Sequence, residues 1–254
     1  MGHHSSIQER MRRMCVFSRL SRELKRVCEK HGLLDNEVAV RARALSAAEA
    51  IGNPEGGEFP LQKGKESLMQ AQFLTGRGQA FTDTFGDFGG SLRQVVDLDC
   101  DDNYCRAVFT ATLNAVLNHL GLVSGTVHCR DDGPAECGED ICNFLQQRFP
   151  GSSRILQIGF QPGMVDAIQM AGRLRVLDRD EERIGTYRGS VRIEGPEAES
   201  EALEWADVLL VTGTTLVNNT LSRYLDRENL YFYGTTIAGA AYLMGWKRLC
   251  PRSE

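Results

Sequence analysis

Hydrophobic residues in the first part of the chain recur with the period of a helix and then with that of a strand. Leu20, Leu24 and Val27 are spaced four and three residues apart, which places them on one face of a helix predicted over residues 7–31. Over residues 37–45, apolar residues recur at every second position, the pattern of a half-buried strand. A segment rich in glycine and proline follows and predicts a loop over residues 52–57.

Two further elements are expected before residue 98. A helix is predicted over residues 65–74, and Gly76-Arg77-Gly78 breaks it. A short strand is predicted over residues 79–83, where it ends in polar residues. Because strands and helices mix here without regular alternation, the sequence predicts a small α+β domain over residues 1–98.

The pattern changes in the second part of the chain, where short apolar strands alternate with helices. Helices are predicted over residues 104–120 and 139–149. Strands are predicted over residues 154–159, 174–178, 191–193, 207–212 and 230–234. Such alternation is typical of βαβ units, whose parallel sheet is covered on both faces. The predicted fold class is therefore α/β, with a Rossmann-like parallel-sheet domain over residues 99–254 preceded by the small α+β domain.

Composition narrows the classes of partner. The 254 residues are 42% hydrophobic and carry a formal net charge of −5, with no block dominated by lysine and arginine. Nucleic-acid binding is disfavoured, because a phosphate backbone calls for a basic surface. No apolar run approaches the length of a membrane span, and the N-terminus lacks the apolar core of a signal peptide, so we expect a cytoplasmic protein. The opening segment is typical of a shortened expression tag, so His3 and His4 are assigned no function.

Three predicted strands end in turns that contain glycine, and two of these turns also contain threonines. In an open parallel sheet these turns meet at the carboxyl edge, where glycine lets a ligand approach the backbone and threonine supplies hydrogen-bond donors. Such residues also make ordinary tight turns and helix caps, but three turns at corresponding strand ends favour a binding edge. The candidate ligand-binding residues are Gly159, Gln161, Pro162, Gly163, Thr212, Gly213, Thr214, Thr215, Asn218, Thr235 and Thr236.

The first of these turns departs from the dinucleotide-binding fingerprint. Gln161 and Met164 stand where that motif needs glycine, and Pro162 lacks an N–H group. Asp178 nevertheless ends the second strand, 19 residues after Gly159, which is the place of a ribose-binding acid. A nucleoside-containing ligand therefore stays open, as does the alternative that Asp178 is a solvated residue at a strand end.

Eight cysteines are present, and in a cytosolic chain their default state is reduced and mostly buried. Residues 128–137 bring together an imidazole, two thiols and several carboxylates, a group that could bind a soft metal. Cys129 and Asp131 are the candidate ligands. The seven residues between Cys129 and Cys137 are not a standard ligand spacing, so a loop with two inert cysteines is the alternative.

Several motifs along the chain resemble one known family. They are Phe59-Pro60-Leu61-Gln62-Lys63-Gly64-Lys65-Glu66, Gly78-Gln79-Ala80-Phe81-Thr82-Asp83, His128-Cys129-Arg130-Asp131, Gly159-Phe160-Gln161-Pro162-Gly163-Met164-Val165, Thr212-Gly213-Thr214-Thr215-Leu216-Val217-Asn218 and Tyr233-Gly234-Thr235-Thr236-Ile237-Ala238-Gly239. Together they resemble the putative heavy-metal chelation family. That resemblance implies an enolase N-terminal-like domain joined to a Rossmann-like domain, with a site in the cleft between them.

The leading functional hypothesis is therefore binding of a heavy metal, or of a metal-chelating small molecule, between the two domains. Lys65, Thr82 and Asp83 are expected to close the cleft from the first domain. The alternative is an enzyme that acts on a small substrate with S-adenosylmethionine or NAD, and a third reading is a ligand sensor or scaffold. Whether a reaction is catalysed stays open, and so does the cofactor, for which a transition metal is the candidate. A homodimer is also compatible, because α/β proteins of this kind are often dimers.

Overall fold

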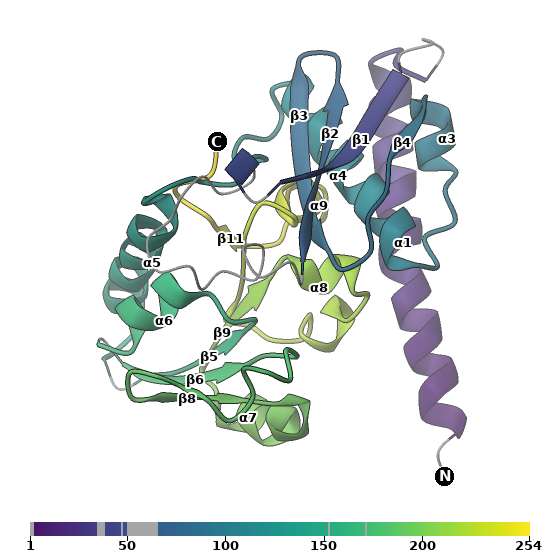
Figure 1. Ribbon diagram of the computed structural model, residues 1–254. Helices are drawn as coiled ribbons and strands as arrows, with labels where there is room; N and C mark the ends of the chain where they lie inside the picture. Colours follow the sequence, from purple (N-terminus) through teal and green to yellow (C-terminus); the bar gives the residue numbers. More distant parts are fainter. Residues whose placement is uncertain (1–2, 35–38, 47, 50–65, 152, 171) are drawn as a thin grey trace.

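The computed structural model describes residues 3–34, 39–46, 48–49, 66–151, 153–170 and 172–254, and these residues form two sheets (Figure 1). The smaller sheet is antiparallel, with strand order β3-β2-β1-β4. Its strands are β1 (Ala39–Leu45), β2 (Ser67–Phe73), β3 (Gly76–Thr82) and β4 (Phe88–Ser91). Lys65 and the motif that precedes it lie outside the described residues.

The expected helix over residues 65–74 is wrong, because Ser67–Phe73 form strand β2. Met69, Ala71 and Phe73 are buried, and they alternate with the polar residues Gln70 and Gln72. That alternation has the period of a strand, and it places one face of β2 against helix α4 (Asn103–His119). The favourable helix propensity of leucine, methionine, glutamine and alanine was outweighed by burial of one strand face.

Helix α4 packs directly on β3, and two glycines make this contact possible. A Cβ atom at Gly76 would lie 2.1 Å from the carbonyl oxygen of Ala115, and one at Gly78 would lie 2.2 Å from the Ala115 nitrogen. Backbone thus meets backbone, with no room for a side chain between them. Helices α1 (His3–Lys30) and α3 (Leu92–Val96) complete this part of the molecule, and α1 lies along its outer side (Figure 1).

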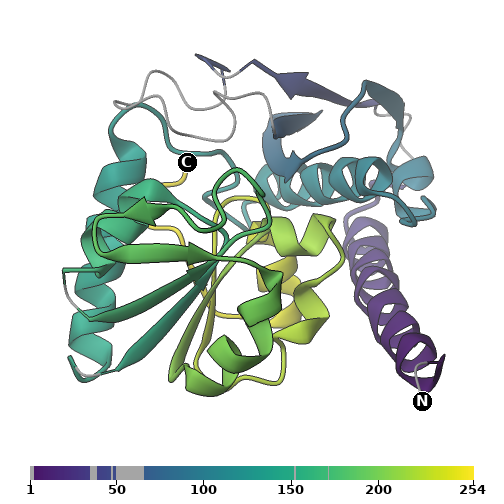
Figure 2. The ribbon, with the colours of Figure 1, turned by 60° about the horizontal axis from the view of Figure 1, so that its bottom comes forward.

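The larger sheet has strand order β11-β10-β9-β5-β6-β8-β7 and is parallel except for the pairing of β7 with β8. Its strands fan out from one edge in Figure 2. They are β5 (Arg154–Ile158), β6 (Arg173–Leu177), β7 (Tyr187–Arg188), β8 (Val191–Glu194), β9 (Val208–Thr212), β10 (Leu230–Tyr233) and β11 (Arg248–Leu249). The expected Rossmann-like α/β arrangement is confirmed, with a mostly parallel sheet and a separate small antiparallel sheet.

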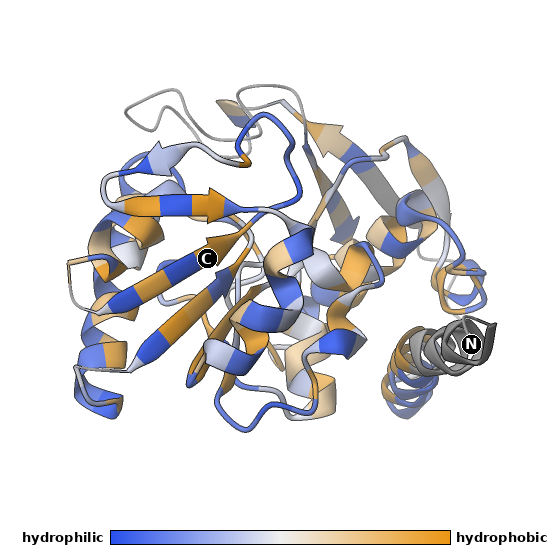
Figure 3. Cartoon of the chain, turned by 90° about the horizontal axis from the view of Figure 1, so that it is seen from below, coloured by the Kyte–Doolittle hydropathy of each residue, from blue (hydrophilic) through white to orange (hydrophobic). Residues whose placement is uncertain are grey.

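Helices cover both faces of the larger sheet, and hydrophobic residues concentrate on its central strands (Figure 3). Ile155 faces α5 (Gly133–Arg148) and α6 (Pro162–Ile168), whereas its neighbour Leu156 faces the opposite core, which extends through α4 to the small sheet. The remaining helical segments are η1 (Pro196–Ala198), α7 (Glu199–Trp205), α8 (Thr214–Val217), η2 (Leu221–Arg223) and α9 (Ala238–Met244). Among the helices that the structure describes, none is both long and apolar enough to cross a membrane.

Candidate functional site

A cavity of about 820 Å³ lies at the carboxyl edge of the parallel sheet, and residues from both parts of the molecule line it. This volume is in the range of small-molecule sites. The sequence-predicted residues that line it are Asp83, Gly159, Gln161, Pro162, Asp178, Thr212, Gly213, Thr214, Thr215, Asn218 and Thr236. Gly163, Thr235, Thr82, Cys129 and Asp131 are not among the lining residues.

Gly159 shapes the turn after β5. Its φ of +92° lies in the region that side chains avoid, and a Cβ atom there would lie 2.7 Å from Cγ2 of Thr212. The Gly159 carbonyl oxygen accepts hydrogen bonds from the Tyr233 hydroxyl, at 2.6 Å, and from Nε2 of Gln157, at 2.9 Å. Burial of the Tyr233 phenol raises its pKa. Two buried side chains, those of Gln157 and Tyr233, therefore hold the turn in place.

Gln161 and its neighbours start helix α6. The Gln161 side-chain oxygen accepts a hydrogen bond from the Met164 nitrogen at 2.6 Å, so this residue caps the helix. Pro162 stands in the first turn, where its missing N–H group costs nothing. Gly163 serves another purpose, because a Cβ atom there would lie 2.7 Å from the Pro134 carbonyl oxygen of α5. It allows two helices to approach and does not face the cavity.

Asp178 joins two of the turns that line the cavity. One of its carboxylate oxygens accepts a hydrogen bond from the Phe160 nitrogen at 2.6 Å, and the other accepts one from the Asp180 nitrogen at 2.8 Å. A carboxylate that accepts backbone N–H groups in this way orders the chain around it. Asp178 thus lines the cavity and also connects two of its turns. Its spacing in the sequence did not indicate this structural role.

The turn after β9 carries hydroxyl groups into the cavity. Thr212 donates its hydroxyl proton to Oγ1 of Thr214 at 3.2 Å, and Thr215 donates to the Thr212 carbonyl oxygen at 2.6 Å. In these contacts the Thr214 hydroxyl only accepts, so its own proton remains able to reach a ligand. Gly213 lies against Ile237, where a Cβ atom would lie 2.8 Å from the backbone nitrogen.

The turn after β10 connects the two parts of the molecule. The Thr236 hydroxyl accepts a hydrogen bond from the Phe81 nitrogen of β3 at 3.0 Å. Fully buried Asn114, on α4, donates to the carbonyl oxygens of Gln79, Thr235 and Thr236 at 2.9 to 3.2 Å. Its side-chain oxygen accepts from the Gly239 nitrogen at 2.7 Å. Asn114 therefore orients this turn, and no motif in the sequence indicated it.

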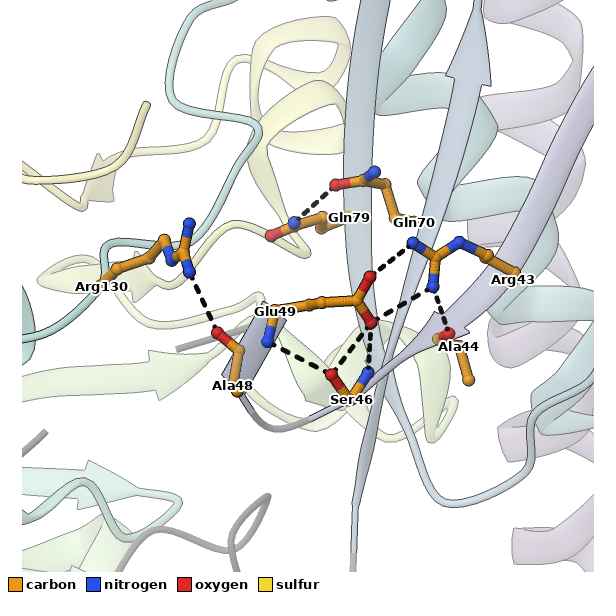
Figure 4. A network of polar contacts seen from close by, with 8 residues as sticks. All are labelled: Arg43, Ala44, Ser46, Ala48, Glu49, Gln70, Gln79 and Arg130. Carbon is orange, nitrogen blue, oxygen red and sulfur yellow. Dashed lines mark hydrogen bonds and ion pairs between the residues drawn. The ribbon is translucent and has the colours of Figure 1, made fainter. Parts of the chain in front are cut away.

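The small sheet and its flanking segments contribute the opposite wall through Glu66, Asp83 and His128. Asp83 is fixed by Nδ2 of Asn103, which donates to its carboxylate at 2.7 Å. The His128 backbone nitrogen donates to Oε1 of Gln79 at 2.7 Å, and Nε2 of Gln79 donates to Gln70 at 2.9 Å. Figure 4 shows the pair formed by Gln79 and Gln70.

A second connection, also visible in Figure 4, ties the chain after β1 to the segment before α5. Arg43 pairs with Glu49 at 2.7 Å, and Nη2 of Arg130 donates to the Ala48 carbonyl oxygen at 3.0 Å. The Arg43 guanidinium and the hydroxyl and N–H groups of Ser46 lower the pKa of the Glu49 carboxyl to about 2. These contacts lie at the surface.

Glu66 lines the cavity, and its carboxyl group has a pKa well above the ordinary value. It is half-buried, and burial together with the charges of Asp178 and Asp83 raises its pKa to about 7. In the sequence Glu66 is only one residue of a charged motif, because the carboxylates that raise its pKa are far from it along the chain. Burial also lowers the pKa of His128.

Charged side chains close the remaining side of the cavity. Arg223 pairs with Glu199 at 2.9 Å, and the Tyr224 hydroxyl donates to the same carboxylate at 2.6 Å. Arg183 pairs with Asp180 at 3.1 Å, and its guanidinium stacks over the Phe160 ring with the central carbon 4.6 Å from the ring centroid. These residues were not predicted from the sequence, because there they look like the charged residues of an ordinary protein surface.

The two candidate metal ligands lie in different environments. Cys129 is buried and packs beside Gly133, whereas Asp131 is an exposed turn residue with a φ of +53°. Cys137 does not lie in a loop, because helix α5 begins at Gly133. Within the described residues, no group of three or more histidine, cysteine, aspartate or glutamate side chains is arranged to hold a metal ion.

Fold and cavity define a class of protein in which a mostly parallel α/β sheet and a small antiparallel sheet line one shared cavity. Within that class, residues 144–230 match the model of the DUF364 family, described as putative heavy-metal chelation. That match confirms, for residues 144–230, the resemblance inferred from the sequence motifs.

Two solved structures are similar to this chain. A DUF364 protein of unknown function from Pyrococcus horikoshii is 16% identical, with a TM-score of 0.55 over 87% of this chain and 79% of that one. A DUF364 protein of unknown function from Desulfitobacterium hafniense is 14% identical, with a TM-score of 0.49 over 70% of this chain and 72% of that one. The first similarity supports the shared fold. No curated protein matches the chain.

Proposed function

We propose that this protein binds a small molecule that chelates a metal, in the cavity between the parallel sheet and the antiparallel sheet. The observation that carries the proposal is the cavity itself, at about 820 Å³, where three strand-end turns meet polar and charged side chains from the other part of the molecule. The family description points in the same direction for the match over residues 144–230.

The donor set favours a chelate over a bare metal ion. The described lining offers carboxylates and one imidazole, but no thiol, which is the group that soft heavy metals prefer. No three potential ligands among the described residues converge on one point. A small chelator would supply most of the metal's ligands itself, while the cavity recognises the chelator through hydroxyl groups, arginines and carboxylates.

Each wall would recognise a different part of such a ligand. Thr214 can donate a hydrogen bond to an anionic oxygen, and the arginines that line the cavity add positive charge. Across the cavity, Glu66 and Asp83 suit a metal centre or a protonated amine. We place the anionic groups of the ligand on the threonine turn and its cationic centre near these carboxylates.

Isothermal titration calorimetry tests the proposal with nickel(II) alone and with nickel(II) nitrilotriacetate as a model chelate. We expect the chelate to bind more tightly than the bare ion. Thr214→Val should weaken chelate binding about tenfold, the equivalent of one lost hydrogen bond. Thr75→Val is the matched control, because Thr75 is exposed and bonds to His119 on another surface.

The proposal fails if neither probe binds with a Kd below about 1 mM. It also fails if Thr214→Val and Thr75→Val bind the chelate equally well. A further comparison uses Asp83→Asn, which should weaken binding of the chelate while Asp87→Asn, an exposed change outside the lining, leaves it unchanged.

The alternative of a nucleoside cofactor receives less support from the geometry. Both carboxylate oxygens of Asp178 already accept backbone hydrogen bonds, from Phe160 and Asp180. The turn after β5 also carries Gln161 as a helix cap where a dinucleotide motif has glycine. Thermal shift measurements with S-adenosylmethionine and NAD test this alternative directly, and a rise in Tm that Asp178→Ala removes would favour it over a metal chelate.

A further inference from the structure

The chain after strand β11 lies against helix α5, and none of its residues is among those that line the cavity. Nε of Arg252 donates to Asp140 at 2.6 Å, and the same guanidinium lies 3.2 Å from Glu136. On the other side of this segment, Glu254 and Val127 exchange two backbone hydrogen bonds of 2.7 and 2.9 Å. The C-terminal segment, residues 250–254, is thus held on both sides.

This anchoring brings together two thiols that are far apart in the sequence. Cys137 lies between Glu136 and Asp140 on α5, and Cys250 lies two residues before Arg252. Each thiol acts on the pKa of the other, and Leu249, next to Cys250, packs against the same apolar cluster that contains Cys137. The ion pairs of Arg252 support this placement independently, because they fix the same stretch of α5 to the same segment.

We propose that Cys137 and Cys250 are a reversible redox pair, whose oxidation by a peroxide forms a disulfide that fastens the C-terminal segment to α5. Neither cysteine lines the cavity, so this proposal does not rest on the proposed ligand site.

The two cysteines differ in the way that such chemistry requires. Cys250 is half-buried, whereas Cys137 is buried with 8% of its surface exposed. The Cys137 thiol lowers the pKa of Cys250, and the positive charge of Arg248 acts in the same direction. The Cys250 thiol and burial raise the pKa of Cys137. Cys250 is therefore the thiolate that meets the oxidant, and Cys137 is the thiol that resolves it.

The steps balance with hydrogen peroxide as the named oxidant. The Cys250 thiolate attacks one peroxide oxygen, an S–O bond forms, the O–O bond breaks, and hydroxide leaves with the second oxygen. The Cys137 sulfur then attacks the Cys250 sulfenic acid, so that an S–S bond forms while the S–O bond breaks. The departing oxygen takes the Cys137 proton and leaves as water. Two electrons pass from the two sulfurs to the peroxide.

Mass spectrometry of the full chain tests the proposal. The protein is reduced, freed of reductant, and treated with a small molar excess of hydrogen peroxide. We expect a mass loss of two hydrogens, and a non-reducing digest in which the Cys137 peptide is joined to the Cys250 peptide. Dithiothreitol should reverse both changes. Because the bond closes a long loop, the oxidised protein should melt about 5 °C higher than the reduced protein.

Two variants separate this pair from general oxidation. Cys250→Ser should abolish the crosslink, whereas Cys142→Ser should retain it, because that thiol on the same helix bonds to the Ala167 carbonyl oxygen instead. Digests of the wild-type protein decide the matter even if a variant folds poorly. Recovery of Cys250 as a free thiol or a sulfinic acid, or joined to Cys129 in place of Cys137, would overturn the proposal.

Discussion

The two walls of the cavity are built by different means. On the parallel-sheet side, backbone groups and short side chains hold each turn, as Asp178 holds the Phe160 nitrogen and Tyr233 holds the Gly159 carbonyl oxygen. On the other side, Glu66 and Asp83 reach the cavity through their side chains. One wall is therefore built from turns whose backbone groups are hydrogen-bonded, whereas the other presents carboxylates to the cavity.

This difference suggests that the two walls have different roles in ligand binding. A wall held by backbone hydrogen bonds keeps its shape whether or not a ligand is bound, and it suits recognition by geometry. A wall of carboxylates responds to pH and to the charge of a ligand, as the raised pKa of Glu66 indicates. The connections between the walls, through Asn114 and Thr236, decide whether they act as one site.

Removing the Asn114 side chain should have the largest effect, because it joins both walls. Asn114→Ala leaves the buried Gly239 nitrogen and three carbonyl oxygens without this partner. We expect a loss of about 3 kcal/mol in the free energy of unfolding, measured by urea denaturation. The half-buried Asn229, with one bond to the Asp207 carbonyl oxygen, is the control, and Asn229→Ala should cost less than about 1 kcal/mol. Equal losses in the two variants would refute the connecting role.

A side chain at Gly159 should disturb the sheet-side wall alone. Gly159→Ala combines a positive φ with a Cβ atom 2.7 Å from Thr212, so we expect a loss of about 2 to 3 kcal/mol in the free energy of unfolding. At Gly151 a Cβ atom would meet nothing within 4 Å, so Gly151→Ala should change stability by less than about 0.5 kcal/mol. The geometric account of the turn fails if both glycines tolerate alanine equally in the same denaturation experiment.

The contrast between the walls also explains which features could be predicted from the sequence. The strand-end turns were predictable because glycine, threonine and strand pattern are local signals, and Gly159 and Thr212–Thr215 do line the cavity. The parallel sheet followed from the same alternation of short apolar strands and helices. Strand β2 was missed, although Met69, Ala71 and Phe73 alternate with glutamines, because their helix propensity favoured the wrong element.

Long-range features could not be predicted in the same way. Asn114 looks like any polar residue within an apolar helix until the fold brings Gln79, Thr235 and Thr236 around it. The pairing of Cys137 with Cys250 spans most of the second half of the chain, whereas the sequence drew attention to Cys129 and Asp131 because they are neighbours. Proximity in sequence is a poor guide to ligand sets that are assembled by tertiary contacts.

The carboxylates of the second wall should make the stability of the protein depend on pH. Below its ordinary pKa of 4.5, Glu66 is protonated in both the folded and the unfolded protein. Between that value and about 7, the unfolded state loses the proton while the folded state keeps it, so stability falls as pH rises, and above 7 the penalty is constant. Glu66→Gln should therefore be more stable than the wild type by about 2 kcal/mol at pH 8, but not at pH 4.

Urea denaturation across pH 4 to 8 measures this difference for Glu66→Gln. The control is Glu139→Gln, a change on the exposed surface of α5, whose difference from the wild type should stay flat across the same range. A flat profile for Glu66→Gln would show that the carboxylates around the cavity do not act on Glu66.

The smallest expected effect comes from two neighbouring threonines that differ only in their partners. The Thr236 hydroxyl accepts the Phe81 hydrogen bond from β3, whereas the Thr235 hydroxyl is buried without a hydrogen-bond partner in the part of the chain that the structure describes. Thr236→Val should cost about 1 kcal/mol, because it leaves a partly buried N–H group unpaired. Thr235→Val replaces an unpaired hydroxyl by a methyl group of similar size and should be neutral or stabilising. Hydrogen exchange at the Phe81 amide should rise in Thr236→Val only, and equal exchange in both variants would mean that this bond does not hold the two walls together.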